Sequence, residues 1–297
     1  IGSPCRFIEP ASMLGRLFGK DEGSIRGDYF GLGPLCHKLG LSSKARKIVK
    51  SSRNAVEIRL AEFDCQLPHV ASRVGGHPAL PDDVPWPLSS DGSPLVFLGQ
   101  FSCDELSTER YEGLPDEGLV SVFLDTLDDV PEEARVFHYS LSRDMRRRPP
   151  PNSSATEKMA YRPTFHAIIT IPRPDSKEYA QLRLSQEEKE AYNDLLDELD
   201  SRLEPSALQL GGHPPYRLEE EAIPPVDDGN WEFFLAVHDV DELFVSWPEG
   251  GCAFIWLPPL DTRFRRGRSA LTYQVLEYED WEEDEEDWDE EEEEDED

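Results

Sequence analysis

Apolar residues alternate with polar ones, or gather in short runs, along most of the chain. In AVEIRLAEF (55–63), Val56, Ile58 and Leu60 alternate with charged residues, and this period of two predicts a half-buried strand. Apolar runs predict seven further strands, at 94–101, 118–125, 134–141, 165–172, 231–238, 252–258 and 271–278. The segment 75–94 holds five prolines and is expected to be a long loop without regular structure.

One helix is predicted with a clear beginning and end. Over 185–203 an apolar stripe recurs every three or four residues and consists of Tyr192, Leu195, Leu196, Leu199 and Leu203. Ser185 and Glu188 have the spacing of a capping box, and Pro205 follows the end. We expect this helix to pack on the sheet, and a shorter helix to run from Ser42 or Ser43 through Ser52.

Three sequence landmarks occur twice in the same order, with offsets of 136, 137 and 133 positions. They are Gly-Gly-His-Pro (75–78 and 211–214), a strand ending in Asp-Glu-Leu (97–106 and 234–243), and a glycine followed by an apolar strand (118–124 and 251–257). Chance rarely keeps three landmarks in register. The sequence therefore predicts an internal duplication with pseudo-repeats at about 72–141 and 207–278.

The same residues resemble a known family. RVGGHPALPDDVPWP, DGSPLVFLGQFSCDEL and LPDEGLVSVFLD closely resemble the YwqG family, a bacterial-type domain of unknown function, and LQLGGHP and SWPEGGCAFIWLPP resemble its later motifs. The resemblance covers roughly 55–278 and implies an α+β fold with extensive antiparallel sheet, but no established activity, cofactor or catalytic residue. We therefore expect an α+β body, mostly antiparallel sheet, built from two duplicated halves with a few packed helices.

Acidic residues dominate the composition and concentrate at the C-terminal end. The net charge is −32, and residues 277–297 hold 18 of the 62 acidic residues and no basic residue. Because like charges repel, 279–297 is expected to be a disordered acidic tail. We expect an N-terminal extension with a short helix at 1–54 and the YwqG-like domain at 55–278. The remaining net charge of −14 disfavours nucleic-acid binding, and no apolar run is long enough to span a membrane.

Few residues have the pattern of a catalytic or metal-binding site. The five cysteines are widely spaced and form no C-x-x-C, which predicts free buried thiols in a reducing cytoplasm. Cys103 with His138 or His166 is a possible nucleophile–base pair, but a structural thiol is the preferred interpretation. His77 and His213 would form a metal site only if the two halves brought them together, and we interpret them as turn residues. We expect no metal, cofactor or catalytic residue.

Candidate binding residues lie in the loops and in the tail. Trp86, between two prolines, is a candidate contact for a protein partner, although burial against the sheet is the preferred interpretation. Two arginine clusters are candidate sites for an anionic partner or for the protein's own tail, and they include Arg146, Arg147 and Arg148 in the first and Arg265 and Arg266 in the second.

The function that we infer from these features is binding. Trp281 and Trp288 interrupt the acidic tail seven residues apart, and solvation alone does not require aromatic residues there. We predict a non-catalytic, cytoplasmic protein-interaction module whose acidic tail binds a basic partner, with the tryptophans as anchors. The alternative is a small-ligand binder or an enzyme with a pocket between the two halves.

Overall fold

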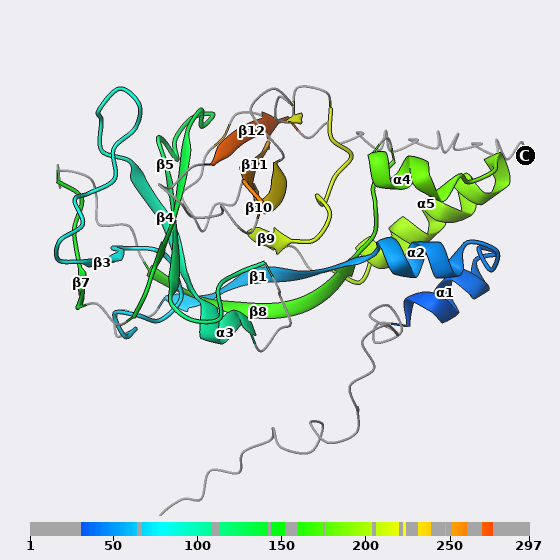
Figure 1. Ribbon diagram of the computed structural model, residues 1–297, viewed down its shortest axis with the longest axis horizontal. Helices are drawn as coiled ribbons and strands as arrows, with labels where there is room; N and C mark the ends of the chain where they lie inside the picture. Colours follow the sequence, from blue (N-terminus) through cyan, green and yellow to red (C-terminus); the bar gives the residue numbers. More distant parts are fainter. Residues whose placement is uncertain are drawn as a thin grey trace, which may run out of the picture.

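The structure is a computed structural model of the chain. It describes residues 31–63, 67–107, 113–141, 144–151, 160–174, 176–203, 206–219, 222–223, 231–238, 247, 251–259 and 269–275. At its centre lie two long antiparallel strands, β1 (Arg53–Phe63) and β8 (Ala160–Thr170). Their register starts with Arg53 opposite Thr170, and both strands curve along the length of the molecule (Figure 1). No helix in these ranges is long and apolar enough to cross a membrane.

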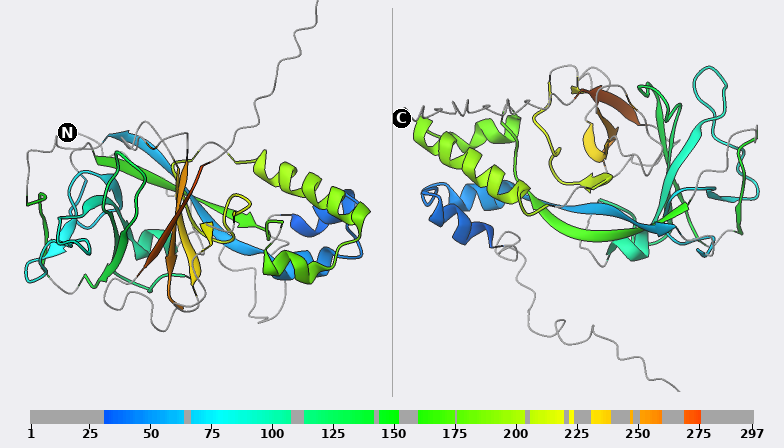
Figure 2. Two further views of the ribbon diagram at one scale, coloured as in Figure 1. Left: turned by 90° about the horizontal axis from the view of Figure 1, so that it is seen from above. Right: turned by 180° about the vertical axis from the view of Figure 1, so that it is seen from behind.

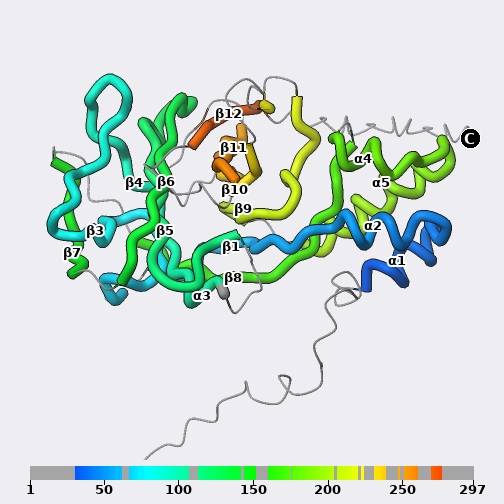
Figure 3. Tube along the Cα trace, viewed as in Figure 1, coloured from blue at the N-terminus to red at the C-terminus, as the bar shows by residue number. Residues whose placement is uncertain are grey.

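A ten-stranded sheet grows outward from both sides of this central pair. Next to β8 come β2 (Arg73–Gly75), β4 (Val96–Ser102), β5 (Leu119–Leu124) and β6 (Ala134–Tyr139). Next to β1 come β9 (Leu208–Gly211), β10 (Glu232–His238), β11 (Cys252–Leu257) and β12 (Ala270–Gln274). The two outer sets of strands rise on the same side of the central pair (Figures 1 and 3). Just before β12, the Ser269 hydroxyl donates to the carbonyl of Ala134 in β6 at 2.6 Å, so the sheet is nearly closed.

The largest core fills the inner face of the curled sheet. Every strand from β4 to β6 and from β9 to β11 contributes to it, and from β1 the residues Val56 and Ile58 point into it. The short helix α3 (Cys103–Ser107) adds Cys103 and Leu106 to the same core. Because successive strand residues point to opposite faces, the intervening residues lie on the outer face and need a cover of their own.

Chain segments cover the outer face on both sides. After the first Gly-Gly motif, β3 (Ala79–Pro81) pairs with β7 (Met145–Arg147), and this part of the chain buries the apolar outer face of β4, β5 and β6. After the second motif, Tyr216 and Leu218 pack on Phe233, Phe254 and the rest of the outer face of β10 and β11.

Four helices form a separate cluster at one end of the molecule. They are α1 (Leu32–Lys38), α2 (Ala45–Ser51), α4 (Lys177–Leu182) and α5 (Gln186–Asp200). Their buried side chains share a small core with Ile169 and Ile171, at the end of β8. Figure 2 shows the helices beyond the ends of β1 and β8, away from the outer strands.

The expected fold class, α+β in two duplicated halves, is wrong. Strands make up 38% and helices 21% of the structure, so the protein is sheet-dominated with one nearly closed, barrel-like sheet. The two sets of repeat strands are not adjacent halves, because β1 and β8 belong to neither set and lie between them. The duplication itself stays a prediction. The helix at 185–203 was expected on the sheet, but it packs against the other helices.

Individual elements follow the sequence pattern closely. All eight predicted strands are present, and α5 begins with the predicted capping box, in which Ser185 and Glu188 bond each other's backbone N–H groups. Two details differ. No side chain caps α2, because its N-cap is Lys44 and not Ser42 or Ser43; the Ser43 hydroxyl donates to the Glu188 carboxylate at 2.6 Å. The loop 75–94 contains β3, and the expected loop 143–158 contains β7.

Substitution of Gly212 tests how tightly the second motif approaches the central pair. Gly212 has a φ of +79°, and an added Cβ would lie 2.5 Å from Thr170 Oγ1 and 2.7 Å from Ala55 Cβ. Gly212→Ala should therefore lower the free energy of unfolding by about 3 kcal/mol, through backbone strain plus steric overlap. The matched control is Gly92→Ala, where φ is +88° and the space is open, with an expected loss of about 1 kcal/mol. Equal losses in urea unfolding would contradict the close approach.

Candidate functional site

The two Gly-Gly-His-Pro motifs lie far apart. In the first motif, Gly75 pairs with Ala160 of β8. In the second motif, Gly211 pairs with Ala55 of β1, and Ala55 in turn lies opposite Ile168 of β8. Eight residues of β8 separate these levels, which is ~26 Å at the rise of a strand. His77 and His213 therefore do not meet. Among the described residues no group of three His, Cys, Asp or Glu side chains is arranged to hold a metal ion.

His213 is fixed inside the structure by two hydrogen bonds. Its ring Nε2–H donates to the carbonyl of Ser51 at 2.8 Å, and its backbone N–H donates to Thr170 Oγ1 at 2.9 Å. The side chain is only 3% exposed. Burial lowers the pKa of His213 to about 4, because the charged ring would lose its hydration, and the bond to Ser51 opposes this only in part. His213 therefore joins the second motif to α2 as a neutral residue.

Trp86 lies in the segment that covers the outer face of β4, β5 and β6, which we call the cover, and its side chain is not on the surface. It is 7% exposed, and its indole Nε1–H donates to the carbonyl of Leu95 at 2.9 Å. Its ring meets that of Phe123 edge to face, with centroids 5.8 Å apart. The side chain thus holds the segment after the first motif against β5.

The first arginine cluster is divided between the surface and the interior. Arg146 is mostly exposed and pairs with Asp82 at 3.2 Å. Arg147 and Arg148 are half-buried and donate to backbone carbonyls, of Leu67 and Val84 respectively. The cluster therefore joins separate loops of the cover. The remaining candidate binding residues lie outside the described residues; they are Arg265, Arg266, Trp281 and Trp288.

Cys103 lies in an environment that keeps its thiol protonated. It is buried in the main core, and burial, followed by the charge of Asp104, raises its pKa to about 12. A nucleophilic cysteine requires the thiolate, so this shift opposes nucleophilic chemistry. His138 donates from Nε2 to the carbonyl of Glu117 at 2.8 Å, while His166 is exposed on the outer face of β8. Among the described residues no hydrogen bond joins Cys103 to either histidine.

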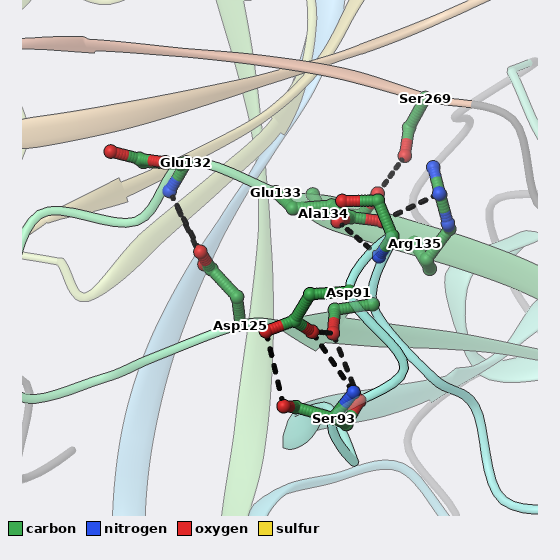
Figure 4. A network of polar contacts seen from close by, with 10 residues as sticks. Asp91, Ser93, Asp125, Glu132, Glu133, Ala134, Arg135 and Ser269 are labelled. Carbon is green, nitrogen blue, oxygen red and sulfur yellow. Dashed lines mark hydrogen bonds and ion pairs between the residues drawn. The ribbon is translucent and has the colours of Figure 1, made fainter.

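A rigid acidic surface is formed by the loops at 88–93 and 125–133, which we call the acidic rim. In the first loop, Leu88 pairs with Pro94, and the backbone N–H of Ser89 donates to the carbonyl of Ser93 at 2.9 Å. The Asp91 carboxylate accepts hydrogen bonds from the Ser89 hydroxyl and from the Ser93 N–H (Figure 4). The bond from Ser89 is the main cause that lowers the pKa of Asp91.

The second loop is held in the same way and is joined to the first. The Asp125 carboxylate accepts from the N–H of Glu132 at 3.2 Å, and the Asp125 N–H donates to the carbonyl of Glu133 at 3.0 Å. The Glu133 carboxylate accepts from the N–H of Ser90 at 2.8 Å and pairs with Arg135 at 2.5 Å. Figure 4 shows this network beside Ser269, where the two edges of the sheet approach each other. These hydrogen bonds thus hold the two loops to each other and fix the backbone within each.

The two loops of the rim expose several acidic groups and one large apolar side chain. Leu88 is 51% exposed, and the exposed acidic residues are Asp91, Asp128, Asp129 and Glu132. Such a surface matches a basic partner, with charge giving attraction and Leu88 an apolar contact. Sequence reasoning missed the rim. The signal was present in DTLDDVPEE (125–133), with five acidic residues in nine positions, but only the fold brings this loop beside 88–93.

Comparison with known proteins identifies a family without a defined activity. The family model described as "Domain of unknown function (DUF1963)" matches residues 72–271. The match is longer than half of the chain, and it includes both Gly-Gly motifs and the acidic rim. No curated protein matches the chain at a significant level.

The depressed pKa of His213 predicts a loss of stability in mild acid. The unfolded chain takes up a proton near pH 6.5 and the folded chain only near pH 4. The contribution of His213 is therefore present above pH 6.5 and lost as the pH falls toward 4. Between pH 7 and pH 5 it should decrease by about 2 kcal/mol. His213→Gln, which keeps an N–H donor, should reduce the stability difference between these pH values by that amount.

A matched control is Thr170→Val, which removes the hydrogen bond to the His213 N–H without altering the ring. It should lower the free energy of unfolding equally at pH 7 and pH 5 in urea titrations. An unchanged pH dependence in His213→Gln would contradict the assignment.

Proposed function

The chain belongs to the family of the Domain of unknown function (DUF1963), and within it we propose a non-catalytic protein-interaction module that binds a basic partner. The motif resemblance to YwqG-like proteins is part of this proposal, and so is a cytoplasmic location. The location is supported by Cys36, Cys103 and Cys252, which are free thiols in the structure, as expected in a reducing compartment.

The acidic rim is the observation that carries this proposal. Its loops are fixed by hydrogen bonds between backbone and carboxylate groups, so little conformational entropy is lost when a partner binds. Its exposed carboxylates lie on two loops that are joined by the hydrogen bond from Ser90 to Glu133, and Leu88 is exposed on the first of them. A partner with lysine or arginine side chains and one apolar residue complements both features.

The acidic tail supports the same conclusion from the sequence. Residues 277–297 add 18 acidic groups, and Trp281 and Trp288 supply apolar anchors. The competing hypothesis is that the tail folds back on the first or the second arginine cluster and masks it. Against folding back on the first cluster, Arg146 already pairs with Asp82, and Arg147 lies beneath the loop at 67–71. The second cluster lies outside the described residues. We therefore propose that the tail and the rim bind the same basic partner.

The ligand-binding alternative takes a different form from the one expected. β1 and β8 occupy the place between the two sets of repeat strands, where a pocket had been expected. What favours a small ligand is instead a pair of arginines, Arg73 and Arg147, beneath the loop at 67–71.

Binding of a labelled basic peptide, measured by fluorescence anisotropy, tests the proposed function. The probe is a fluorescein-labelled peptide of lysine, arginine and leucine. Truncation after Tyr278 should weaken binding at least ~10-fold at 0.1 M salt, where the Debye length is ~10 Å, and less at 1 M salt, where it is ~3 Å. In the full chain, Asp129→Asn with Glu132→Gln should weaken binding ~3- to 10-fold, as expected for two exposed charge pairs.

The control for charge alone is Glu190→Gln with Asp194→Asn, on the exposed face of α5 at the far end of the molecule. It changes the net charge equally and should leave the affinity within twofold. Trp281→Ala with Trp288→Ala should weaken the binding that remains at 1 M salt, because the anchors are apolar. Equal affinities of the rim variant, the truncated chain and the wild type would overturn the proposal.

A further inference from the structure

Two arginine side chains converge beneath one surface loop. Arg73 is the first residue of β2 and is 1% exposed, on the outer face of the sheet opposite Gln100 of β4. Arg147 is the last residue of β7, the small strand of the cover, and is half-buried. The two residues come from different layers of the structure, so the folded protein alone brings their guanidinium groups together.

Both guanidinium groups donate to the same stretch of backbone. Nη2 of Arg73 donates to the carbonyls of Pro68 and His69, and Nη2 of Arg147 donates to the carbonyl of Leu67. These are three successive carbonyls of the loop at 67–71. Gln100 fixes the same loop, since its Nε2 donates to the carbonyls of His69 and Ala71 at 2.9 and 2.8 Å.

This arrangement leaves the two positive charges uncompensated. In the part of the chain that the structure describes, neither guanidinium pairs with a carboxylate. The Nε atoms of Arg73 and Arg147 are both buried and have no hydrogen-bond partner. The two charges also repel each other: burial first, and then the charge of Arg147, lowers the pKa of Arg73 to about 10. A buried charge without a partner is strongly unfavourable in proteins.

A purely structural role explains only part of this. If the arginines served only to hold the loop, one donor group on each would be enough, and a neutral donor such as an amide would do the same. Gln100 shows that the chain uses an amide for that purpose at this loop. Carbonyl dipoles satisfy hydrogen bonds but do not neutralise two charges. An oxyanion would satisfy the remaining donors and balance the charge together.

We propose that Arg73 and Arg147 form a binding site for the phosphate group of a small ligand, beneath the loop at 67–71. A phosphate dianion matches the two guanidinium charges, and the planar, multiply donating guanidinium suits its oxygens. The site lies one residue layer below the surface, because Pro68, His69 and Val70 are exposed above it. Binding requires this short loop to move, because its carbonyls occupy the Nη2 donors. The site is separate from the acidic rim, and its proposal does not rest on that of basic-partner binding.

The experiment uses the full chain and inorganic phosphate as the probe. Titration of phosphate at constant ionic strength, with chloride as the replaced ion, should raise the melting temperature, by about 2–4 °C at a tenfold excess over Kd. Sulfate should compete and acetate should not. Absence of a phosphate-specific rise in the wild-type protein would overturn the proposal without any mutation.

The variants separate ligand binding from a structural role. Arg73 is fully buried and its replacement risks misfolding, so the main variant is Arg147→Gln, at the half-buried position, which removes the charge and keeps an N–H donor. It should weaken phosphate binding in calorimetry at least tenfold while the protein stays folded. The matched control is Arg148→Gln, the next residue, which removes the same charge and should change the affinity less than twofold.

The source of the phosphate group is decided by a second titration. Tighter binding of O-phospho-L-serine than of inorganic phosphate indicates an organic phosphate ester as ligand, and equal or weaker binding indicates free phosphate. Phosphate binding that is equal in Arg147→Gln and the wild type would overturn the assignment to this pair. Loss of basic-peptide binding in the rim variants leaves this result unchanged, so the two proposals fail independently.

Discussion

The pairing of β1 with β8 is the constraint on which the rest of the structure depends. Each strand has eleven residues, and their register runs nearly the whole length of the pair. At one end of the pair, Ile169 packs into the core of the helices. Four further strands lie on each side of the pair. β2 pairs with the outer edge of β8 and β9 with the outer edge of β1, so this central pair joins the two outer sets of strands. The ~26 Å between the two Gly-Gly motifs follows from it directly.

Covering the sheet on both faces buries backbone polar groups on its outer face. Backbone groups of the covering segments are buried and need partners. Two buried glutamines provide them. Gln100 bonds the loop before the first motif and the N–H of Ala79 after it, and Gln209 bonds the carbonyls of Gly211 and His213 at the second motif. Fixed segments on each side then place the acidic rim on one and His213 on the other.

Local patterns in the sequence predicted the elements but not their arrangement. The period of two in β1 and the stripe and capping box of α5 are local signals, and the structure confirms them. The order of strands is set by contacts between distant segments, which no local pattern contains. β7 was missed because MRR carries no apolar alternation, and its pairing with Ala79–Pro81 comes entirely from the fold.

The same limit explains the candidate sites. Burial of Trp86 against the sheet was the preferred interpretation, and the side chain is buried, with its indole donating to the carbonyl of Leu95. Arg147 was a candidate for an anionic partner by residue type, but no local pattern showed that its guanidinium donates to the carbonyl of Leu67 inside the structure. Conversely, the five acidic residues of 125–133 were visible in the sequence. They become a surface only because Glu133 bonds the backbone of Ser90 from a distant loop.

The strong negative charge of the chain does not argue against an oxyanion site. At physiological ionic strength the Debye length is about 8 Å, so exposed carboxylates farther away are largely screened. Buried charges are screened much less, and the field beneath the loop at 67–71 is therefore set mainly by Arg73 and Arg147 themselves. A net charge of −32 slows the approach of an anion, but it does not reverse the sign of the local field at the two guanidinium groups. An acidic surface and a buried basic site are thus compatible in one fold, because each is suited to a ligand of opposite charge and the two are screened from each other.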